Sequence, residues 1–336
     1  MAFAPETVVH GGDLDAARQR FPAAPAPWID LSTAINPIAY PLPAFCPEAW
    51  SRLPLKADDQ ALREVAARCY RAADPAMVVP APGAQSLIQI VPRLRESSRV
   101  AILGPTYGEH IAAWLREGHE AIEVEDLAAA SDASVVVLVN PNNPTGRIVD
   151  TGEIGTLAAA LAKRGGLLVI DEAFADVMPE GISAVPDLPP ATIVLRSFGK
   201  AYGLPGVRLG FAVADTQIAS RLSDYLGPWA VSGPALAAGS AALADKPWLD
   251  SARARLASDA AKLDEILAGK GFRIIGGTPL FRLAAHPMAQ QIAETLGHHG
   301  IHVRRFREQP TWIRFGIPGP ATDWQRVERA LGAARG

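Results

Sequence analysis

The sequence predicts an α/β protein: a mostly parallel sheet covered by helices, a smaller α+β domain at the C-terminal end, and an N-terminal strap. Two observations predict the sheet. Short apolar runs recur along the first two thirds of the chain, at 100–103, 135–139, 167–170, 193–195 and 209–213. These runs are apolar throughout, as is typical of strands covered on both faces. Segments of helical periodicity alternate with them, which indicates βαβ units.

The helices of this large domain are expected where apolar residues recur every three to four positions, at 58–71, 84–95, 109–117 and 151–164. After residue 214 the pattern becomes mainly helical, with helices expected at 215–226, 232–244 and 247–269. Strands at 272–276, 280–285, 301–306 and 312–317 and a helix at 287–297 follow. In the last helix, Thr322 and Gln325 have the spacing of a capping box. We therefore predict a smaller α+β domain with mostly antiparallel strands.

The N-terminal segment is rich in proline, which excludes a long helix or a central strand there. One interpretation is a disordered arm. Against it, the segment carries apolar residues that a solvated tail would lack: Trp28, Ile29, Leu31, Phe45 and Trp50. We expect an ordered strap at 1–45 that joins the small domain, a large domain at 46–235 and a small domain at 236–336.

Composition excludes several classes of protein. The chain has 336 residues, 49% hydrophobic and 20% charged, which is typical of a globular protein. Its formal net charge of −3 gives no support to nucleic-acid binding. Cys46 and Cys69 form no metal-binding motif, so we expect neither a disulfide nor a metal site. We expect a cytoplasmic location, because a reducing compartment suits free cysteines. No signal peptide and no apolar stretch long enough to span a membrane is recognisable.

Lys200 is the first candidate for chemistry. It follows the apolar run TIVLRS, where an open α/β sheet places its ligand crevice. Gly203, Gly206 and Arg208 come next in the sequence. A lysine there is a nucleophile able to form a Schiff base if burial or a nearby cation lowers its pKa. The alternative is an ordinary lysine in a surface loop.

Three further motifs also follow predicted strands. The first is NPNNPTG at 140–146, which is also typical of a simple Pro/Asn turn. The second is LLVIDEAF, which places Asp171 at the end of an apolar strand, a costly position unless a cation meets the carboxylate. The third is APGAQSLIQ at 81–89, a glycine turn opening a helix whose free N–H groups bind anions.

Together these motifs resemble those of the fold-type-I pyridoxal-phosphate enzymes, aminotransferase class I/II, over the chain after residue 30. The resemblance implies pyridoxal 5'-phosphate as cofactor, with Lys200 bound to it covalently and Asp171 paired with its ring nitrogen. It also implies a set of further cofactor contacts: Asn143 to the ring hydroxyl oxygen, Tyr107 on the ring face, and the Ala84 and Gln85 amides with Ser197 and Arg208 at the phosphate. Arg314 in WIRFGI matches the arginine that grips a substrate carboxylate, the alternative being an ordinary exposed strand arginine.

Three features are similar to one branch, the L-threonine-O-3-phosphate decarboxylases of cobalamin biosynthesis. They are VVHGGD at 8–13 with DLSTAINP at 30–37, DEAF with Phe174, and GPWAVS with Ser232 in place of an asparagine. The resemblance implies a substrate-phosphate site made by His10, the backbone of Gly11 and Gly12, Asn36 and Arg304. His10 alternatively belongs to a solvated tail.

Arg304 and Arg305 are neighbours on a predicted strand, so their side chains face opposite ways and only one enters the site. The motif favours Arg304. Related aminotransferases carry a tyrosine that reaches the neighbouring subunit's cofactor, and Leu53 stands in its place. That contact between subunits is therefore in doubt, although the resemblance still implies a homodimer.

The resemblance thus implies decarboxylation of a small phosphorylated amino acid, L-threonine O-3-phosphate, to (R)-1-amino-2-propanol O-2-phosphate and CO₂. The alternative is an aminotransferase acting on a phosphorylated amine such as histidinol phosphate. The two reactions share the same catalytic groups, so the motifs do not separate them. A regulator built on this fold would need a DNA-binding domain ahead of the strap, for which the sequence offers no segment.

Overall fold

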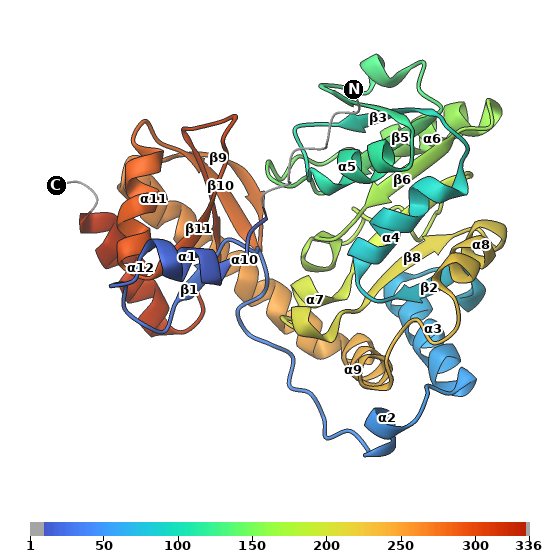
Figure 1. Cartoon of the computed structure of the whole chain (residues 1–336), viewed down its shortest axis with the longest axis horizontal. Helices are drawn as coiled ribbons and strands as arrows, with labels where there is room; N and C mark the ends of the chain where they lie inside the picture. The colour runs from blue at the N-terminus through green and yellow to red at the C-terminus, as the bar shows by residue number, and fades with distance from the viewer. Residues whose placement is uncertain (1–9, 334–336) are drawn as a thin grey trace.

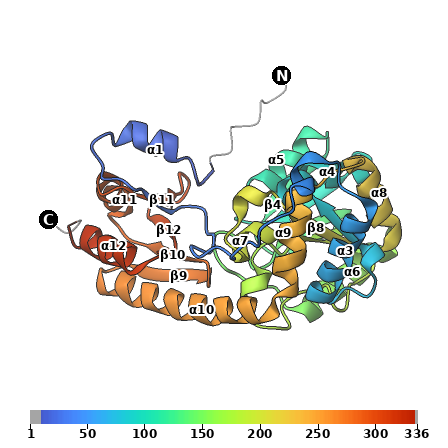
Figure 2. The ribbon, with the colours of Figure 1, turned by 90° about the horizontal axis from the view of Figure 1, so that it is seen from below.

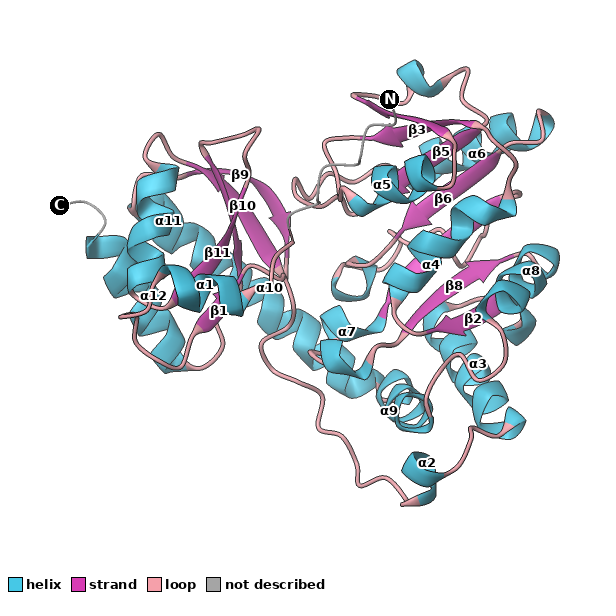
Figure 3. Cartoon of the chain, viewed as in Figure 1, coloured by secondary structure: helices cyan, strands magenta, loops and turns pink. Residues whose placement is uncertain are grey.

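The computed structural model describes residues 10–333 and contains two sheets (Figure 1 and Figure 3). The larger sheet has seven strands. The strand order is β2-β8-β7-β6-β5-β3-β4. The bounds are β2 Val78–Ala81, β3 Arg99–Leu103, β4 Glu120–Val124, β5 Val135–Val139, β6 Leu167–Asp171, β7 Thr192–Ser197 and β8 Gly210–Ala214. Strands β3 to β7 pair in parallel, while β8 is antiparallel to β7 and to β2. The predicted mostly parallel sheet is confirmed.

Helices cover both faces of this sheet (Figure 1). Their bounds are α3 Lys56–Tyr70, α4 Ala84–Ile90, α5 Glu109–Arg116, α6 Thr151–Lys163, α7 Phe198–Ala201, α8 Thr216–Leu226 and α9 Gly233–Ala244. Along β5, Val136 and Leu138 belong to one apolar core and Val135 and Val137 to the other. All four are fully buried. This arrangement explains why the strand is apolar throughout.

Two strands of the large sheet, β2 and β4, were not predicted, and they lie at its two edges. Strand β2 contains Pro80, which has no N–H to donate and is tolerated at an edge. Strand β4 buries only Val124, so it shows no apolar run. Both edges therefore lack the pattern by which the central strands are recognised.

The smaller sheet has the order β1-β11-β12-β10-β9. The bounds are β1 Ile29–Leu31, β9 Arg273–Thr278, β10 Phe281–Ala285, β11 Ile301–Arg305 and β12 Trp312–Gly316, with α10 Lys246–Gly269, α11 Ala289–His298 and α12 Ala321–Ala333. Strands β9 to β12 pair antiparallel, as expected, and β1 pairs parallel to β11. Figure 2 shows α10 running from beneath the small sheet to the large unit.

The predicted capping box of the last helix is wrong. Helix α12 begins at Ala321, so Thr322 lies inside its first turn. The amides of Asp323 and Trp324 both donate to the carbonyl oxygen of Pro320. The turn therefore starts at the proline, whose fixed φ suits a helix start.

From residue 10, where the described residues begin, the N-terminal segment runs over both units. It forms α1 (Leu14–Arg20), adds β1 to the small sheet, crosses to the large unit and forms α2 (Glu48–Ser51) (Figure 1). Residues 8 and 9 of the VVHGGD motif lie outside the described residues. Within residues 10–333, no helix combines the length and apolarity needed to cross a membrane.

Candidate active site

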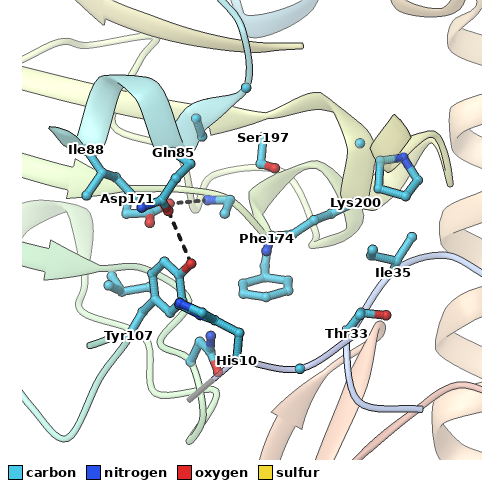
Figure 4. Close-up of a pocket in the computed structure, with 18 of the residues that line it drawn as sticks. His10, Thr33, Ile35, Gln85, Ile88, Tyr107, Asp171, Phe174, Ser197 and Lys200 are labelled. Atoms are coloured by element: carbon cyan, nitrogen blue, oxygen red, sulfur yellow. Dashed lines mark hydrogen bonds between the residues drawn. The ribbon is translucent and has the colours of Figure 1, made fainter. Parts of the chain in front are cut away.

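A cavity of about 340 Å³ opens at the carboxyl ends of the central strands (Figure 4). Val139, Asp171 and Ser197, the last residues of β5, β6 and β7, all line it. Eleven of the predicted site residues line it together: His10, Gly11, Ala84, Gln85, Tyr107, Asn143, Asp171, Ser197, Lys200, Arg208 and Arg314. The folded chain therefore brings together motifs that lie more than 300 positions apart.

Lys200 lies near the end of the short helix α7, and its side chain points into the cavity beside Phe174 (Figure 4). Its Nζ lies 4.6 Å from the centre of the Phe174 ring. Burial lowers the pKa of Lys200 from 10.5 to about 8. The nearby Asp171 opposes this shift, whereas Arg314 and Arg208 add to it. An amine with this pKa is partly neutral, and hence nucleophilic, near neutral pH.

Asp171 is buried, with 4% of its surface exposed. Its Oδ1 accepts a hydrogen bond from the Ala173 amide at 3.0 Å, and its Oδ2 lies 3.0 Å from His110 Nε2. His110 was not predicted as a site residue, although it belongs to the helix predicted over 109–117, on whose buried face it lies. The two contacts fix the carboxylate at the cavity wall, where it can meet a cationic ring nitrogen.

The start of α4 forms a cradle for an anion. Gly83 precedes the helix with φ of +82° and offers no side-chain cap to the first amides, those of Ala84 and Gln85. A Cβ on Gly83 would lie 2.7 Å from Arg208 Nη2, so the guanidinium packs directly on the glycine backbone. Ser197 lines the same cavity. Backbone amides, a hydroxyl and a guanidinium together suit a phosphate group.

Two asparagines of NPNNPTG hold the turn, and the third lines the cavity. Asn140 exchanges hydrogen bonds with the Val149 backbone, and Asn142 donates to the Pro105 carbonyl oxygen. These two hold the turn, as the simple turn interpretation expected. Asn143 lines the cavity, and its Oδ1 accepts from Arg314 Nη1, which leaves its Nδ2 as the donating atom.

Tyr107 stands on the wall of the cavity between His10 and Gln85 (Figure 4). Its hydroxyl donates to Gln85 Oε1 at 3.1 Å, and burial raises its pKa to about 12. Its ring is therefore held in place and stays neutral, as a stacking surface requires. Phe174 also lines the cavity.

Arg314 is buried rather than exposed on its strand, with 6% of its surface accessible. Its Nη1 donates to Asn143 Oδ1 and its Nη2 to the Ser32 carbonyl oxygen. Burial, together with the neighbouring Arg304, lowers the pKa of Arg314 to about 9. The guanidinium thus joins the strap to the turn that carries Asn143.

Arg304 does not line the cavity, although its Cα is the cross-strand partner of Arg314. Its guanidinium lies 5.5 Å from the centre of the Phe306 ring. Arg305 turns the other way and pairs with Glu294 of α11 at 2.7 Å. The two arginines therefore face opposite ways, as expected, but Arg304 does not line the cavity that the motif favoured for it.

Asn36 is not brought into the cavity, contrary to the expectation of a phosphate ligand. Its side chain is buried, and both ends of its amide bind protein: Nδ2 donates to the Ala201 carbonyl oxygen, and Oδ1 accepts from Arg255. The reason is that the strap turns at this point to pack on the loop that carries Lys200.

The HGG motif is tied to the DLS motif. A Cβ on Gly11 would lie 2.5 Å from the Ser32 carbonyl oxygen, and the Gly12 amide donates to Ser32 Oγ. His10 Nε2 lies 3.0 Å from Glu109 Oε1. Glu109 and Ser32 were not predicted as site residues, because nothing in the sequence shows which segment the strap meets.

Comparisons with known proteins add to this geometry. Residues 55–333 match the model of the aminotransferase class I and II family. A threonine-phosphate decarboxylase of Pseudomonas aeruginosa is 40% identical over 96% of this chain and 96% of its own length, and one of a Sinorhizobium species is 41% identical over 96% and 97%. A crystal structure of histidinol-phosphate aminotransferase from Sinorhizobium meliloti with pyridoxal-5'-phosphate covers 99% of this chain and 98% of its own, with a TM-score of 0.81 and 22% identity.

Proposed function

The chain belongs to the aminotransferase class I and II family, and on this premise we propose that it decarboxylates L-threonine O-3-phosphate, using pyridoxal 5'-phosphate. The observation that carries the proposal is its identity of 40% and 41%, over 96% of the chain, to two threonine-phosphate decarboxylases. The products are CO₂ and (R)-1-amino-2-propanol O-2-phosphate. The reaction is a step of cobalamin biosynthesis.

The residues of the cavity fit the cofactor. The uncapped start of α4 behind Gly83, with Arg208 packed on that glycine, suits its phosphate. The Lys200 amine suits its aldehyde carbon, and the buried Asp171 carboxylate suits a protonated ring nitrogen. Tyr107 offers a ring face, and Asn143 Nδ2 a donor to the ring hydroxyl oxygen. When bound, pyridoxal phosphate withdraws electrons from the Cα of an amino acid joined to it.

The residues of the site then have distinct tasks. Lys200 binds the cofactor and later delivers a proton from Nζ to Cα of the decarboxylated substrate. Asp171 keeps the proton on the ring nitrogen, and His110 holds Asp171 in place. Arg314 is placed to bind an anionic group of the substrate, with Arg304 as its neighbour on β11.

The outcome at Cα would depend on how the protein holds the substrate against the bound cofactor, which would accept the electrons of one bond at Cα. A decarboxylase must present the bond to the carboxylate, and an aminotransferase the Cα–H bond. Of the two arginines, only Arg314 lines the cavity, where it is placed to control this choice by binding the substrate. We propose Arg314 for the carboxylate, since a planar guanidinium binds it through two hydrogen bonds.

The second candidate is transamination of a phosphorylated amine such as histidinol phosphate. The support for it is that a histidinol-phosphate aminotransferase of Lactiplantibacillus plantarum is 28% identical over 82% of this chain, a lower identity than that of the two decarboxylases. The test is to incubate the purified holoenzyme with L-threonine phosphate, with and without 2-oxoglutarate. We expect CO₂ release without 2-oxoglutarate and none from Lys200→Ala. Turnover that requires 2-oxoglutarate and proceeds on histidinol phosphate would overturn the proposal.

We also propose a homodimer in the cytoplasm. The support is a set of exposed large apolar side chains on α2, the loop after it and the loop before α9: Trp50 at 72%, Leu53 at 63%, Leu55 at 63% and Trp229 at 59% exposure. Such exposed apolar surface marks protein–protein contacts. Both cysteines are free, which suits a reducing compartment. Light scattering of Trp50→Glu should give the mass of a monomer and of wild type that of a dimer.

A further inference from the structure

The carbonyl groups at the end of α7 receive their hydrogen bonds from the strap. A helix ends with carbonyl groups that have no partner inside the helix. Here Lys200 O accepts from the Asn36 amide at 2.9 Å, and Ala201 O accepts from Asn36 Nδ2 at 2.8 Å. Tyr202 O accepts from the Tyr40 amide at 2.8 Å. Three consecutive carbonyl groups around the reactive lysine are therefore fixed by one short strap segment.

The strap and the Lys200 loop pack closely at this contact. Asn36 is 2% exposed. A Cβ on Gly203, whose φ is +64°, would lie 2.7 Å from the Asn36 carbonyl oxygen and 2.8 Å from the Ala39 Cα. The glycine is required there because the loop and the strap touch backbone to backbone.

The orientation of the Asn36 amide is set from outside the cavity. Arg255, on α10, donates from Nη2 to Asn36 Oδ1 at 2.8 Å, and the Ile38 amide donates to the same oxygen at 3.0 Å. With two donors on Oδ1, the Nδ2 end must face Ala201. Arg255 also pairs with Asp259 one turn further along α10. It does not line the cavity, so it cannot touch a substrate held there.

The same strap segment is bound at its other end by Arg314, which donates to the Ser32 carbonyl oxygen. Only a few residues of the strap thus lie between Ser32, which Arg314 contacts, and Asn36, which contacts the backbone of the Lys200 loop.

We propose that Asn36 is a positioning residue that fixes Lys200 from behind, and that Arg255 holds the Asn36 amide in the orientation this requires. The inference rests on the proposed function only for its assay substrate. It replaces the expectation, from family resemblance, that Asn36 binds the substrate phosphate. The two roles differ in their consequences, because a phosphate ligand acts on substrate affinity and a clamp on Lys200 acts on the reactive nitrogen.

The test compares the holoenzymes of Asn36→Ala, Arg255→Met and Arg255→Lys. Arg282→Gln is the matched control, since Arg282 also pairs with an α10 carboxylate, Asp264 at 2.7 Å, and does not line the cavity. Thermal unfolding first establishes that each variant is folded. The pH titration of the visible cofactor band is then recorded without substrate, and kcat and KM are measured with L-threonine phosphate.

We expect Asn36→Ala and Arg255→Met to raise the midpoint of the titration by about half a pH unit, because water reaching Nζ favours the protonated form. We expect kcat to fall about fivefold, the usual effect of one lost hydrogen bond, with KM within about twofold of wild type. Arg255→Lys, which keeps a donor for Asn36 Oδ1, should recover most of both values, and Arg282→Gln should match wild type.

Two results would overturn the inference. One is a raised KM for Asn36→Ala with unchanged kcat and titration and no effect of Arg255→Met, which is the behaviour of a phosphate ligand. The other is an equal effect of Arg282→Gln on the titration, which would show a general loss of packing. If wild type fails to turn over L-threonine phosphate, the proposed function fails, whereas the titration still decides the role of Asn36.

Discussion

The lowered pKa of Lys200 predicts how fast the apoenzyme captures its cofactor at each pH. Only the neutral amine attacks an aldehyde, so the capture rate follows the neutral fraction of Lys200. Burial favours that neutral form and moves the pKa from 10.5 to about 8. The rate should therefore rise about tenfold per pH unit below pH 7 and level off above about pH 9.

The size of the effect follows from the two pKa values. At a pH of about 7.5, a lysine with a pKa of about 8 is roughly one quarter neutral, and one with a pKa of 10.5 about one thousandth. Lys200 should accordingly capture the cofactor on the order of 200-fold faster than its ordinary pKa would allow. The assay is stopped-flow growth of the visible band after mixing apoenzyme with pyridoxal phosphate. An exposed lysine in a short peptide is the control for ionisation of the cofactor itself.

Asp171→Asn tests the cause of the shift. The Asp171 carboxylate raises the pKa of Lys200 against the effect of burial, so removing its charge should move the midpoint below 8. The amide has nearly the same shape and can still contact His110. A wild-type midpoint near 10.5, or an Asp171→Asn midpoint above that of wild type, would refute this account of the site.

Three further predictions concern binding, turnover and folding. Gly83→Ala should raise the Kd for the cofactor more than about tenfold, because φ of +82° strains an alanine and its Cβ would lie 2.7 Å from Arg208 Nη2. Fluorescence titration of the apoenzyme with the cofactor measures this Kd. Arg314→Lys should lower kcat/KM about 10- to 100-fold, because one ammonium cannot replace two diverging donors. Glu172→Gln should destabilise the fold by about 3 kcal/mol in urea unfolding, because it leaves the buried Arg196 short of a charged partner.

The first two of these predictions have a control. Gly206→Ala places a Cβ in open space two residues before Arg208 and should leave cofactor affinity unchanged. Arg305→Lys alters an arginine that pairs with Glu294 away from the cavity, and its kcat/KM should stay near that of wild type. Equal losses in a variant and its control would contradict the role assigned to the first residue.

The sequence alone predicts the parallel sheet and the residues at its carboxyl edge. The central strands are apolar throughout because both of their faces are covered, and this pattern is local. Asp171, Asn143 and Lys200 each follow such a strand, and the ends of adjacent parallel strands converge on one edge. Placing them in one cavity therefore required no knowledge of long-range contacts.

The strap shows the limit of this reasoning. Its ordered state follows from its apolar residues, but which residues it contacts does not. His10 pairs with Glu109, and Asn36 turns away from the cavity toward the Lys200 loop and Arg255. These contacts join residues up to 219 positions apart, and no periodicity or spacing encodes them.

Arg314, in the small domain, shows the same limit of what the sequence predicts. Strand alternation separates Arg304 from Arg305, because successive side chains point to opposite faces. Whether Arg314 is exposed or buried depended on the strap, since pairing of β1 with β11 brings the Ser32 carbonyl oxygen to its guanidinium. The sequence by itself thus determined the sheet, its edge and the chemical groups there. The tertiary structure decided which of the remaining polar residues face the cavity and which hold the chain in place, because burial and hydrogen-bond partners arise only once distant segments meet.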